Sequence, residues 1–123
     1  MPDRTLEQCY ILILEDEFLL AADLQDELER AGAIILGPAG SIDAARALLA
    51  AAPEVDGAVL DINLDGEQSY PIADELLERD VPFLFTTGYS EDAIPARYRQ
   101  IARCQKPVRA AIVRDAIGRV VHA

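Results

Sequence analysis

The chain has 123 residues, with 11 basic side chains against 22 acidic ones and a net charge of −11 at pH 7. This length suits one domain, and a hydrophobic content of 51% is enough for a core without disulfides. The negative charge argues against nucleic acid as a direct partner. No apolar run approaches the roughly 20 residues that cross a bilayer, and no signal-peptide pattern opens the chain, so no membrane association is expected. The two cysteines lack metal-ligand spacing and fit a reduced, cytoplasmic setting.

The basic residues gather at one end of the chain. Residues 1–94 carry four arginines against 21 acids, whereas residues 95–123 carry six arginines and Lys106 against Asp115 alone. This asymmetry has two interpretations, which the sequence leaves open. The basic end is either a solvated helix face or a docking surface for an acidic partner, including the acidic body of a second copy.

Short apolar segments recur along the chain, as is typical of strands buried on both faces of a parallel sheet. Four of them are Tyr10–Leu14, Ile34–Gly37, Ala58–Leu60 and Pro82–Phe85. We predict a brief fifth strand at Arg103–Gln105.

Helical patterns separate these strands, because apolar residues recur three and four positions apart. They predict helices around Leu20–Ala31, Ile42–Ala52, Ile72–Leu77 and Val108–Val121. Ser41 is a candidate cap for the second helix, Pro71 suits the first turn of the third, and Gly32 follows the end of the first.

The interval between Gly88 and Lys106 holds only 17 residues and contains Pro95, so a helix there must be short or irregular. Ser90 is a candidate cap for it. Five βα units with right-handed crossovers predict an α/β fold with a doubly wound, five-stranded parallel sheet in the order 2-1-3-4-5. One domain is expected to fill residues 1–123.

Polar residues follow the apolar segments at the points where the strands end. Glu15 and Asp16 end the first strand, Asp61 the third, Thr87 the fourth and Lys106 the fifth. Each residue taken alone has a simple structural explanation as a cap, turn or surface residue. Because doubly wound sheets bind ligands at the carboxyl ends of their strands, we expect the five side chains to converge on one site.

Three carboxylates at such close range repel one another unless a proton or a cation lies among them. Mg²⁺ suits this setting, because it prefers oxygen ligands and is often held by one or two carboxylates and a phosphate. Asp61 is the candidate nucleophile toward a bound phosphoryl group, with Lys106 and Thr87 as donors to its oxygens. Glu17 is assigned instead to the start of the first helix, where a negative charge favours the helix dipole.

The motifs "ILEDE", "LDINL", "TTGY" and "QKPV" occur in an order and spacing that resemble the receiver domains of bacterial two-component response regulators. The resemblance covers nearly the whole chain. It implies that Asp61 accepts a phosphoryl group from a histidine kinase or a histidine phosphotransfer protein. It also implies that Mg²⁺ is bound by Glu15, Asp16, Asp61 and the main-chain carbonyl of Asn63, while Thr87 and Lys106 bind the phosphoryl group.

A narrower resemblance lies in "PFLFTTGY", Pro82–Tyr89. It is similar to the Pro-Phe-x-Phe-Ala-Thr-Gly signature of single-domain receivers that often serve kinases of the HWE family. Thr86 replaces the alanine of that signature. The resemblance implies a stand-alone receiver without an output domain, which either signals through protein contacts or acts as a phosphate sink, and which is no enzyme beyond its own phosphorylation and dephosphorylation.

Two positions depart from the receiver pattern. Arg103 stands where receivers usually carry an aromatic residue that rotates on activation, and Tyr89 or Tyr98 is a candidate substitute. The loop after Asp61 is also short and lacks the customary proline.

Two other functions fit parts of the sequence. A phosphorylation-independent interaction module would keep the fold, although the presence of the acids, Thr87 and Lys106 speaks against it. A Mg²⁺-dependent phosphatase with an aspartyl-phosphate intermediate usually has an acid two residues after its nucleophile, where this chain has Asn63.

Overall fold

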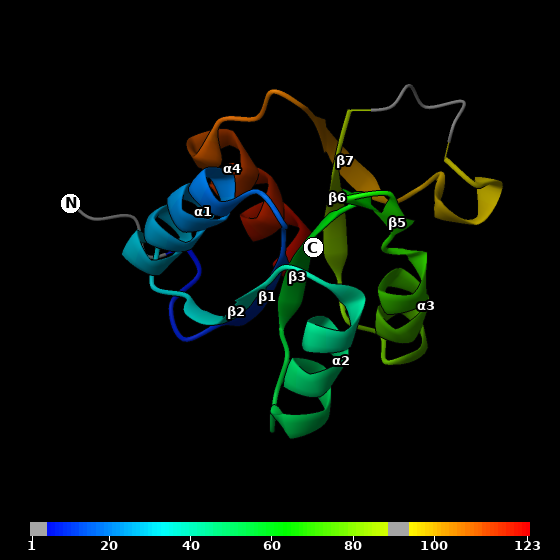
Figure 1. The fold of residues 1–123 in the computed structure, drawn as a ribbon. Helices are drawn as coiled ribbons and strands as arrows, with labels where there is room; N and C mark the ends of the chain where they lie inside the picture. The colour runs from blue at the N-terminus through cyan, green and yellow to red at the C-terminus, as the bar shows by residue number, and fades with distance from the viewer. Residues whose placement is uncertain (1–4, 89–93) are drawn as a thin grey trace.

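A parallel sheet with helices on both faces forms the molecule, described for residues 5–88 and 94–123 of a computed structural model (Figure 1). The main sheet has the order β2-β1-β3-β6-β7, and all of its neighbouring strands are parallel. Counted along the chain without the small β4–β5 hairpin, this is the predicted order 2-1-3-4-5. The strands are β1 (Tyr10–Leu14), β2 (Ile34–Ala39), β3 (Gly57–Asp61), β6 (Phe83–Thr87) and β7 (Ala102–Gln105).

Two layers of helices cover the sheet. The helices are α1 (Phe18–Arg30), α2 (Ile42–Ala51), α3 (Tyr70–Glu78) and α4 (Ala110–Val121). The first and last helices lie together on one face, and α2 and α3 lie together on the other (Figure 1). Each face has its own apolar cluster, so the sheet is buried between two cores. None of the helices in the described residues is long and apolar enough to cross a membrane.

Local signals in the sequence set several helix boundaries as predicted. The Ser41 hydroxyl accepts a hydrogen bond from the Ala44 N–H at 3.1 Å, and Pro71 lies in the first turn of α3. Gly32 has φ +100° just after the end of α1, a conformation that glycine adopts without strain. The chain can therefore leave α1 and enter β2 within a few residues.

The prediction that every early strand is buried on both faces was wrong for β2. This strand lies at an edge of the sheet, where only β1 pairs with it, and Ile34 at its start is 43% exposed. The central strands β3 and β6 are buried at every residue. An apolar run indicates a strand but does not show whether the strand has one neighbour or two.

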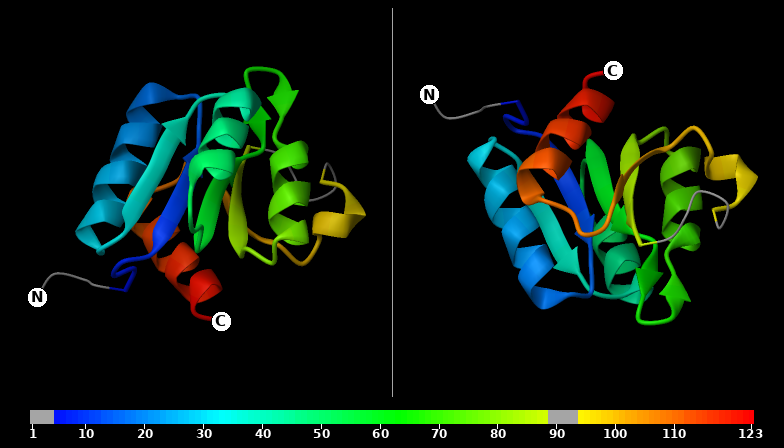
Figure 2. Two further views of the ribbon diagram at one scale, coloured as in Figure 1. Left: turned by 90° about the horizontal axis from the view of Figure 1, so that it is seen from below. Right: turned by 90° about the horizontal axis from the view of Figure 1, so that it is seen from above.

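A hairpin forms in the segment after β3, where a short polar loop without the customary proline was expected. It is formed by β4 (Asn63–Leu64) and β5 (Glu67–Gln68), with Asp65 and Gly66 at its tip in conformations of positive φ. Positive φ at both central residues is the mark of a tight two-residue hairpin turn. Figure 2 shows this hairpin, in bright green, beside the first turn of α3.

The interval between β6 and β7 contains one 3₁₀ turn, η2 (Ala96–Tyr98), in the part that the structure describes. No α-helix occurs in residues 94–101, which agrees with the expected short or irregular element. The predicted cap at Ser90 lies outside the described residues. The last helix begins two residues later than predicted, at Ala110.

Tyr98 connects η2 to α3 through ring packing and a hydrogen bond. Its ring is fully buried, stacks on Tyr70 at a centroid distance of 5.0 Å and meets Phe85 edge to face. Its hydroxyl donates a hydrogen bond to the Asp74 carboxylate, which also pairs with Arg97 at 3.2 Å. Burial, followed by the hydrogen bond to Asp74, raises the pKa of Tyr98 to about 12.

We predict that Tyr98→Phe lowers the free energy of unfolding by about 1 kcal/mol near pH 8, because it removes a hydrogen bond to a half-exposed charged group. A raised pKa means that the fold favours the neutral phenol. The stabilisation is therefore complete below the unfolded pKa near 10 and is lost as pH rises toward about 12.

Urea unfolding of both proteins at pH 8 and at pH 11 measures this difference, which should shrink at the higher pH. Tyr10→Phe, at the start of β1, is the matched control for the loss of one phenol. An equal effect of the two substitutions would show that the Tyr98 hydroxyl makes no special contribution.

Candidate functional site

The carboxyl ends of the main strands bring the predicted site residues to one edge of the sheet. The Glu15 N–H donates to the Ala39 carbonyl at 2.9 Å, and the Lys106 N–H donates to the Thr87 carbonyl at 2.7 Å. These bonds extend the parallel ladder one residue beyond β1 and β7. Side chains that follow separate strands are thereby held next to Asp61, the last residue of β3.

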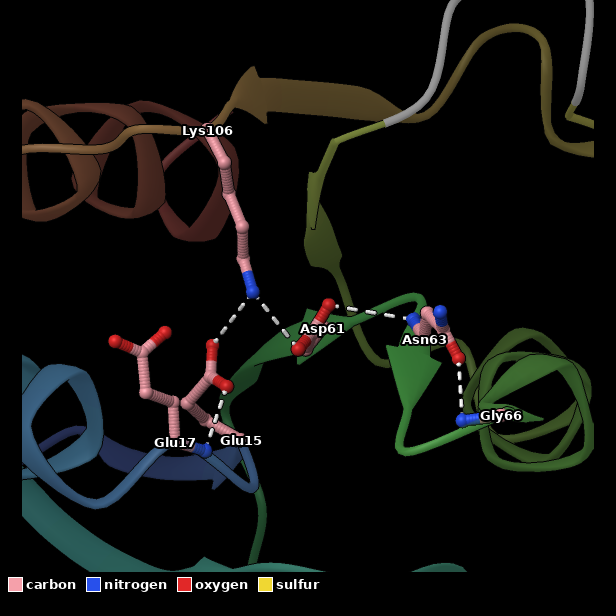
Figure 3. A network of polar contacts seen from close by, with 6 residues as sticks. All are labelled: Glu15, Glu17, Asp61, Asn63, Gly66 and Lys106. Carbon is pink, nitrogen blue, oxygen red and sulfur yellow. Dashed lines mark hydrogen bonds and ion pairs between the residues drawn. The ribbon is translucent and has the colours of Figure 1, made fainter.

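Lys106 reaches across this edge to two acids. Its Nζ lies 2.9 Å from Oδ2 of Asp61 and 3.4 Å from Oε1 of Glu15 (Figure 3). Both carboxylate residues are only 3% exposed. Burial alone favours the neutral amine, but the hydrogen bond and charge of Asp61, with a smaller effect of Glu15, raise the pKa of Lys106. The lysine is therefore a cation at neutral pH.

Glu15 is held from two sides. Its Oε2 accepts a hydrogen bond from the Glu17 N–H at 3.0 Å, while its Oε1 is buried and contacts Lys106 without a hydrogen bond. Burial is the main cause that raises the pKa of Glu15 to about 7, and the charge of Asp61 raises it further. The hydrogen bond from the Glu17 N–H and the charge of Lys106 lower the pKa, but they do not cancel the effect of burial. One ammonium thus does not fully compensate the acids of this site.

The carboxylates of Glu15, Asp16 and Asp61 each place an oxygen within 4.8 Å of the others. Asp16 is exposed, so the cluster opens to solvent on one side. Hard oxygen ligands around a site that keeps access to water match the needs of Mg²⁺, which retains part of its water shell. The poorly compensated Oε1 of Glu15 is a further reason to expect a cation. The three residues therefore fit a magnesium ion.

The hairpin after β3 supports Asp61 from the other side. The Asn63 N–H donates to Oδ1 of Asp61 at 3.2 Å, and Oδ1 of Asn63 accepts from the Gly66 N–H at 2.9 Å (Figure 3). Reasoning from the sequence missed this hairpin, although the Asp65-Gly66 pair is a known turn signal. The Asn63 main-chain carbonyl as a metal ligand stays a prediction.

Glu17 stands apart from the acid cluster, as expected. It occupies the N-cap position of α1 and its exposed side chain makes no capping hydrogen bond. In Figure 3 its carboxylate points away from Asp61. The capping contact comes instead from Glu15, which accepts the Glu17 N–H.

Thr87 ends β6 and is 2% exposed, and its carbonyl is fixed by Lys106. The role of its hydroxyl toward a phosphoryl group stays a prediction. Arg103 lies on β7 opposite Phe85 and donates to the Arg99 carbonyl at 3.4 Å, so no aromatic ring occupies this position. Of the two candidate substitutes, Tyr98 is buried on η2, and Tyr89 lies outside the described residues.

No model of a known protein family matches the sequence, and no curated protein is significantly similar to it. Solved structures are similar over nearly the whole chain. The solution structure of SdrG from Sphingomonas melonis Fr1 is 34% identical with a TM-score of 0.72, and the match covers 94% of this chain and 98% of that chain. The BeF3-activated conformation of SdrG is 37% identical at the same TM-score, with coverage of 94% and 95%.

The response regulator REC domain of PhyR from Erythrobacter litoralis has a higher TM-score of 0.81 at 27% identity, and the match covers 95% of this chain and 92% of that chain. These similarities agree with the strand order, with the acids at the ends of β1 and β3, and with the lysine that follows β7. The chain therefore belongs to the receiver domains of response regulators.

Proposed function

We propose that Asp61 is the phosphoacceptor of this receiver and takes a phosphoryl group from a phosphohistidine in a Mg²⁺-dependent reaction. The observation that carries the proposal is that Asp61 lies close to both a cation and two further acids. Lys106 Nζ lies 2.9 Å from one of its oxygens, and carboxylate oxygens of Glu15 and Asp16 lie within 4.8 Å. This arrangement offers an incoming phosphate the positive charge of Lys106 and offers a metal the oxygen ligands of the three acids.

The chemistry needs little from the protein beyond position and charge. A carboxylate oxygen of Asp61 forms a bond to phosphorus while the phosphorus–nitrogen bond of the phosphohistidine breaks, and the imidazole nitrogen keeps the electron pair. Lys106 is proposed to offset the charge of the phosphoryl oxygens, and the Thr87 hydroxyl is proposed to donate to one of them. The Asn63 N–H holds the carboxylate of Asp61 in orientation.

Glu15, Asp16 and Asp61 are the side chains proposed to hold Mg²⁺, together with the Asn63 main-chain carbonyl. The ion would neutralise charge on the phosphoryl oxygens. Because Asp16 is exposed, the ion would have access to the cluster from solvent.

The proposed donor is a sensor histidine kinase, for which the HWE family is a candidate, or a histidine phosphotransfer protein. A cytoplasmic receiver of this kind either changes its contacts with a downstream protein or drains phosphate from the kinase. The role is that of a signalling phosphoacceptor that catalyses only its own phosphorylation and dephosphorylation.

We predict that incubation with acetyl phosphate and Mg²⁺ adds the mass of one phosphoryl group to the intact protein. Asp61→Asn should abolish the adduct, because an amide is a poor nucleophile toward phosphorus. Asp65→Asn is the matched control, since it removes the same charge from an exposed residue of the β4–β5 turn, and it should leave the adduct intact.

Mass spectrometry of the intact protein in the presence and absence of EDTA gives the readout. An adduct that persists in the Asp61→Asn protein would assign the phosphoryl group to another residue. A wild-type protein that takes up no phosphoryl group from either acetyl phosphate or a phosphorylated histidine kinase would favour the phosphorylation-independent module.

We predict opposite effects of two substitutions on Mg²⁺ affinity. Glu15→Gln should weaken binding by at least about tenfold, because even supporting residues of metal sites contribute that much. Lys106→Gln should strengthen binding by roughly threefold to tenfold, because the ammonium that faces Asp61 and Glu15 no longer repels the ion.

Titration calorimetry with MgCl₂ measures both effects, and circular dichroism checks the fold. Glu17→Gln is the matched control, because the residue is acidic and adjacent but lies outside the cluster. If the substitution of Glu17 weakens binding as much as that of Glu15, the ion responds to the general acidity of this surface and not to a defined ligand set.

A further inference from the structure

Thr86, which replaces the alanine of the narrower receiver signature, has a buried hydroxyl. The residue lies on β6 and is 1% exposed. Its Oγ1 has no hydrogen-bond partner among the described residues. A buried hydroxyl without a partner lowers the stability of a fold, and an alanine at this position would avoid that cost. The hydroxyl is therefore expected to have a partner in another state of the site.

The register of the sheet places Thr86 beside Asp61. Thr86 pairs with Asp61 of β3 on one side and with Cys104 of β7 on the other. Paired residues of neighbouring strands point to the same face of a sheet, so these three side chains share one face. Leu84, two residues before Thr86, belongs to the apolar cluster that α1 and α4 cover. The Thr86 side chain therefore lies on the α1 and α4 side of the sheet, next to the proposed phosphoacceptor.

Lys106 reaches the acids across this part of the sheet. It follows β7, and β6 lies between β7 and β3, so its side chain crosses the end of β6 to contact Asp61 (Figure 3). The hydrogen bond to Asp61 uses one of the three N–H donors of the ammonium. Glu15 contacts the same Nζ at 3.4 Å through an oxygen that makes no hydrogen bond. The ammonium thus has a further donor available near the end of β6.

From these observations we infer that Thr86 is a positioning residue whose hydroxyl accepts a hydrogen bond from Lys106 when a cation engages Glu15 and Asp61. A cation next to these acids repels the ammonium, and the hydroxyl offers the ammonium a buried acceptor in place of a carboxylate. Lys106 can then remain close enough to meet a phosphoryl group on Asp61. The inference rests on the proposed function and adds a role for the threonine that replaces alanine.

A purely structural explanation also exists, because threonine is common in strands for its branched side chain. Valine has the same branched shape without the hydroxyl. If the hydroxyl has no partner in any state, Thr86→Val should leave the site unaffected and should leave the fold as stable or more stable. If the hydroxyl holds Lys106, the same substitution should impair the site although the fold is no less stable. The two explanations therefore differ in a measurable way.

The first test is titration calorimetry with MgCl₂. Thr86→Val should weaken Mg²⁺ binding by about threefold to tenfold, which corresponds to the loss of one hydrogen bond in the bound state. Thr86→Ser keeps the hydroxyl and should bind Mg²⁺ like the wild-type protein. Ser69→Ala is the matched control, because it removes another buried hydroxyl without a partner among the described residues, at the start of α3. It should leave Mg²⁺ affinity unchanged.

The second test is the initial rate of phosphorylation by acetyl phosphate at saturating Mg²⁺. Thr86→Val should lower this rate by about threefold to tenfold, because Lys106 is held less firmly near the phosphoryl oxygens. Thr86→Ser should restore it. Urea unfolding without Mg²⁺ should show that Thr86→Val is at least as stable as the wild-type protein.

Several results would overturn the inference. Equal Mg²⁺ affinity and equal phosphorylation rates in Thr86→Val and the wild-type protein would remove the role of the hydroxyl and leave the proposed function intact. Equal impairment in Thr86→Ser and Thr86→Val would assign the effect to the methyl group. Lower stability of Thr86→Val without Mg²⁺ would assign it to packing. A wild-type protein that neither binds Mg²⁺ nor takes up a phosphoryl group would overturn the proposed function together with this inference.

Discussion

The repulsion between two nearly buried carboxylates is the constraint on which the site depends. Oxygens of Glu15 and Asp61 lie within 4.8 Å of each other, where two full charges repel by about 3 kcal/mol or more even under surface-like screening. The Lys106 ammonium offsets part of this and leaves three carboxylates with one cation. Burial, and to a smaller extent the charge of Asp61, raises the pKa of Glu15 to about 7. A bound cation would therefore lower the repulsion among the carboxylates of this site.

The sheet topology is what brings the lysine to the acids. Lys106 comes from the far end of the sequence and can meet Asp61 only because β7 is the second strand beyond β3, with β6 between them. The hydrogen bond from the Lys106 N–H to the Thr87 carbonyl fixes the Lys106 backbone, from which the side chain extends. The side chain then has to cross the end of one strand, a distance that lysine can span. A shift of β7 by one residue would turn this side chain to the opposite face of the sheet.

Much of this site was predictable because strand ends in a doubly wound sheet have a fixed relation to one another. Asp61 was identified from its position after an apolar run, and Lys106 from its position after the predicted fifth strand at Arg103–Gln105. The burial of Tyr98 was not predictable in the same way, since its partners Tyr70 and Asp74 are more than twenty residues away and lie on another element. The β4–β5 hairpin did have a local signal in Asp65-Gly66, which a search for long apolar runs passes over.

A groove of about 760 Å³ along the outer edge of β7 adjoins the acid cluster at residues 105–107. Gln105 and Pro107 line the groove, and Lys106 between them points to Asp61. Coupling between the two sites requires that each ligand distinguishes two arrangements of the same element. If Asp61 is phosphorylated as proposed, the modified carboxylate is the one that Lys106 contacts at 2.9 Å, so the contacts of Lys106 would change. Residues 105–107 belong to both places, so they are the backbone through which the two would be coupled. By reciprocity, a molecule that binds the groove more tightly in one arrangement of this backbone alters the affinity of the acid cluster for phosphate by the same factor.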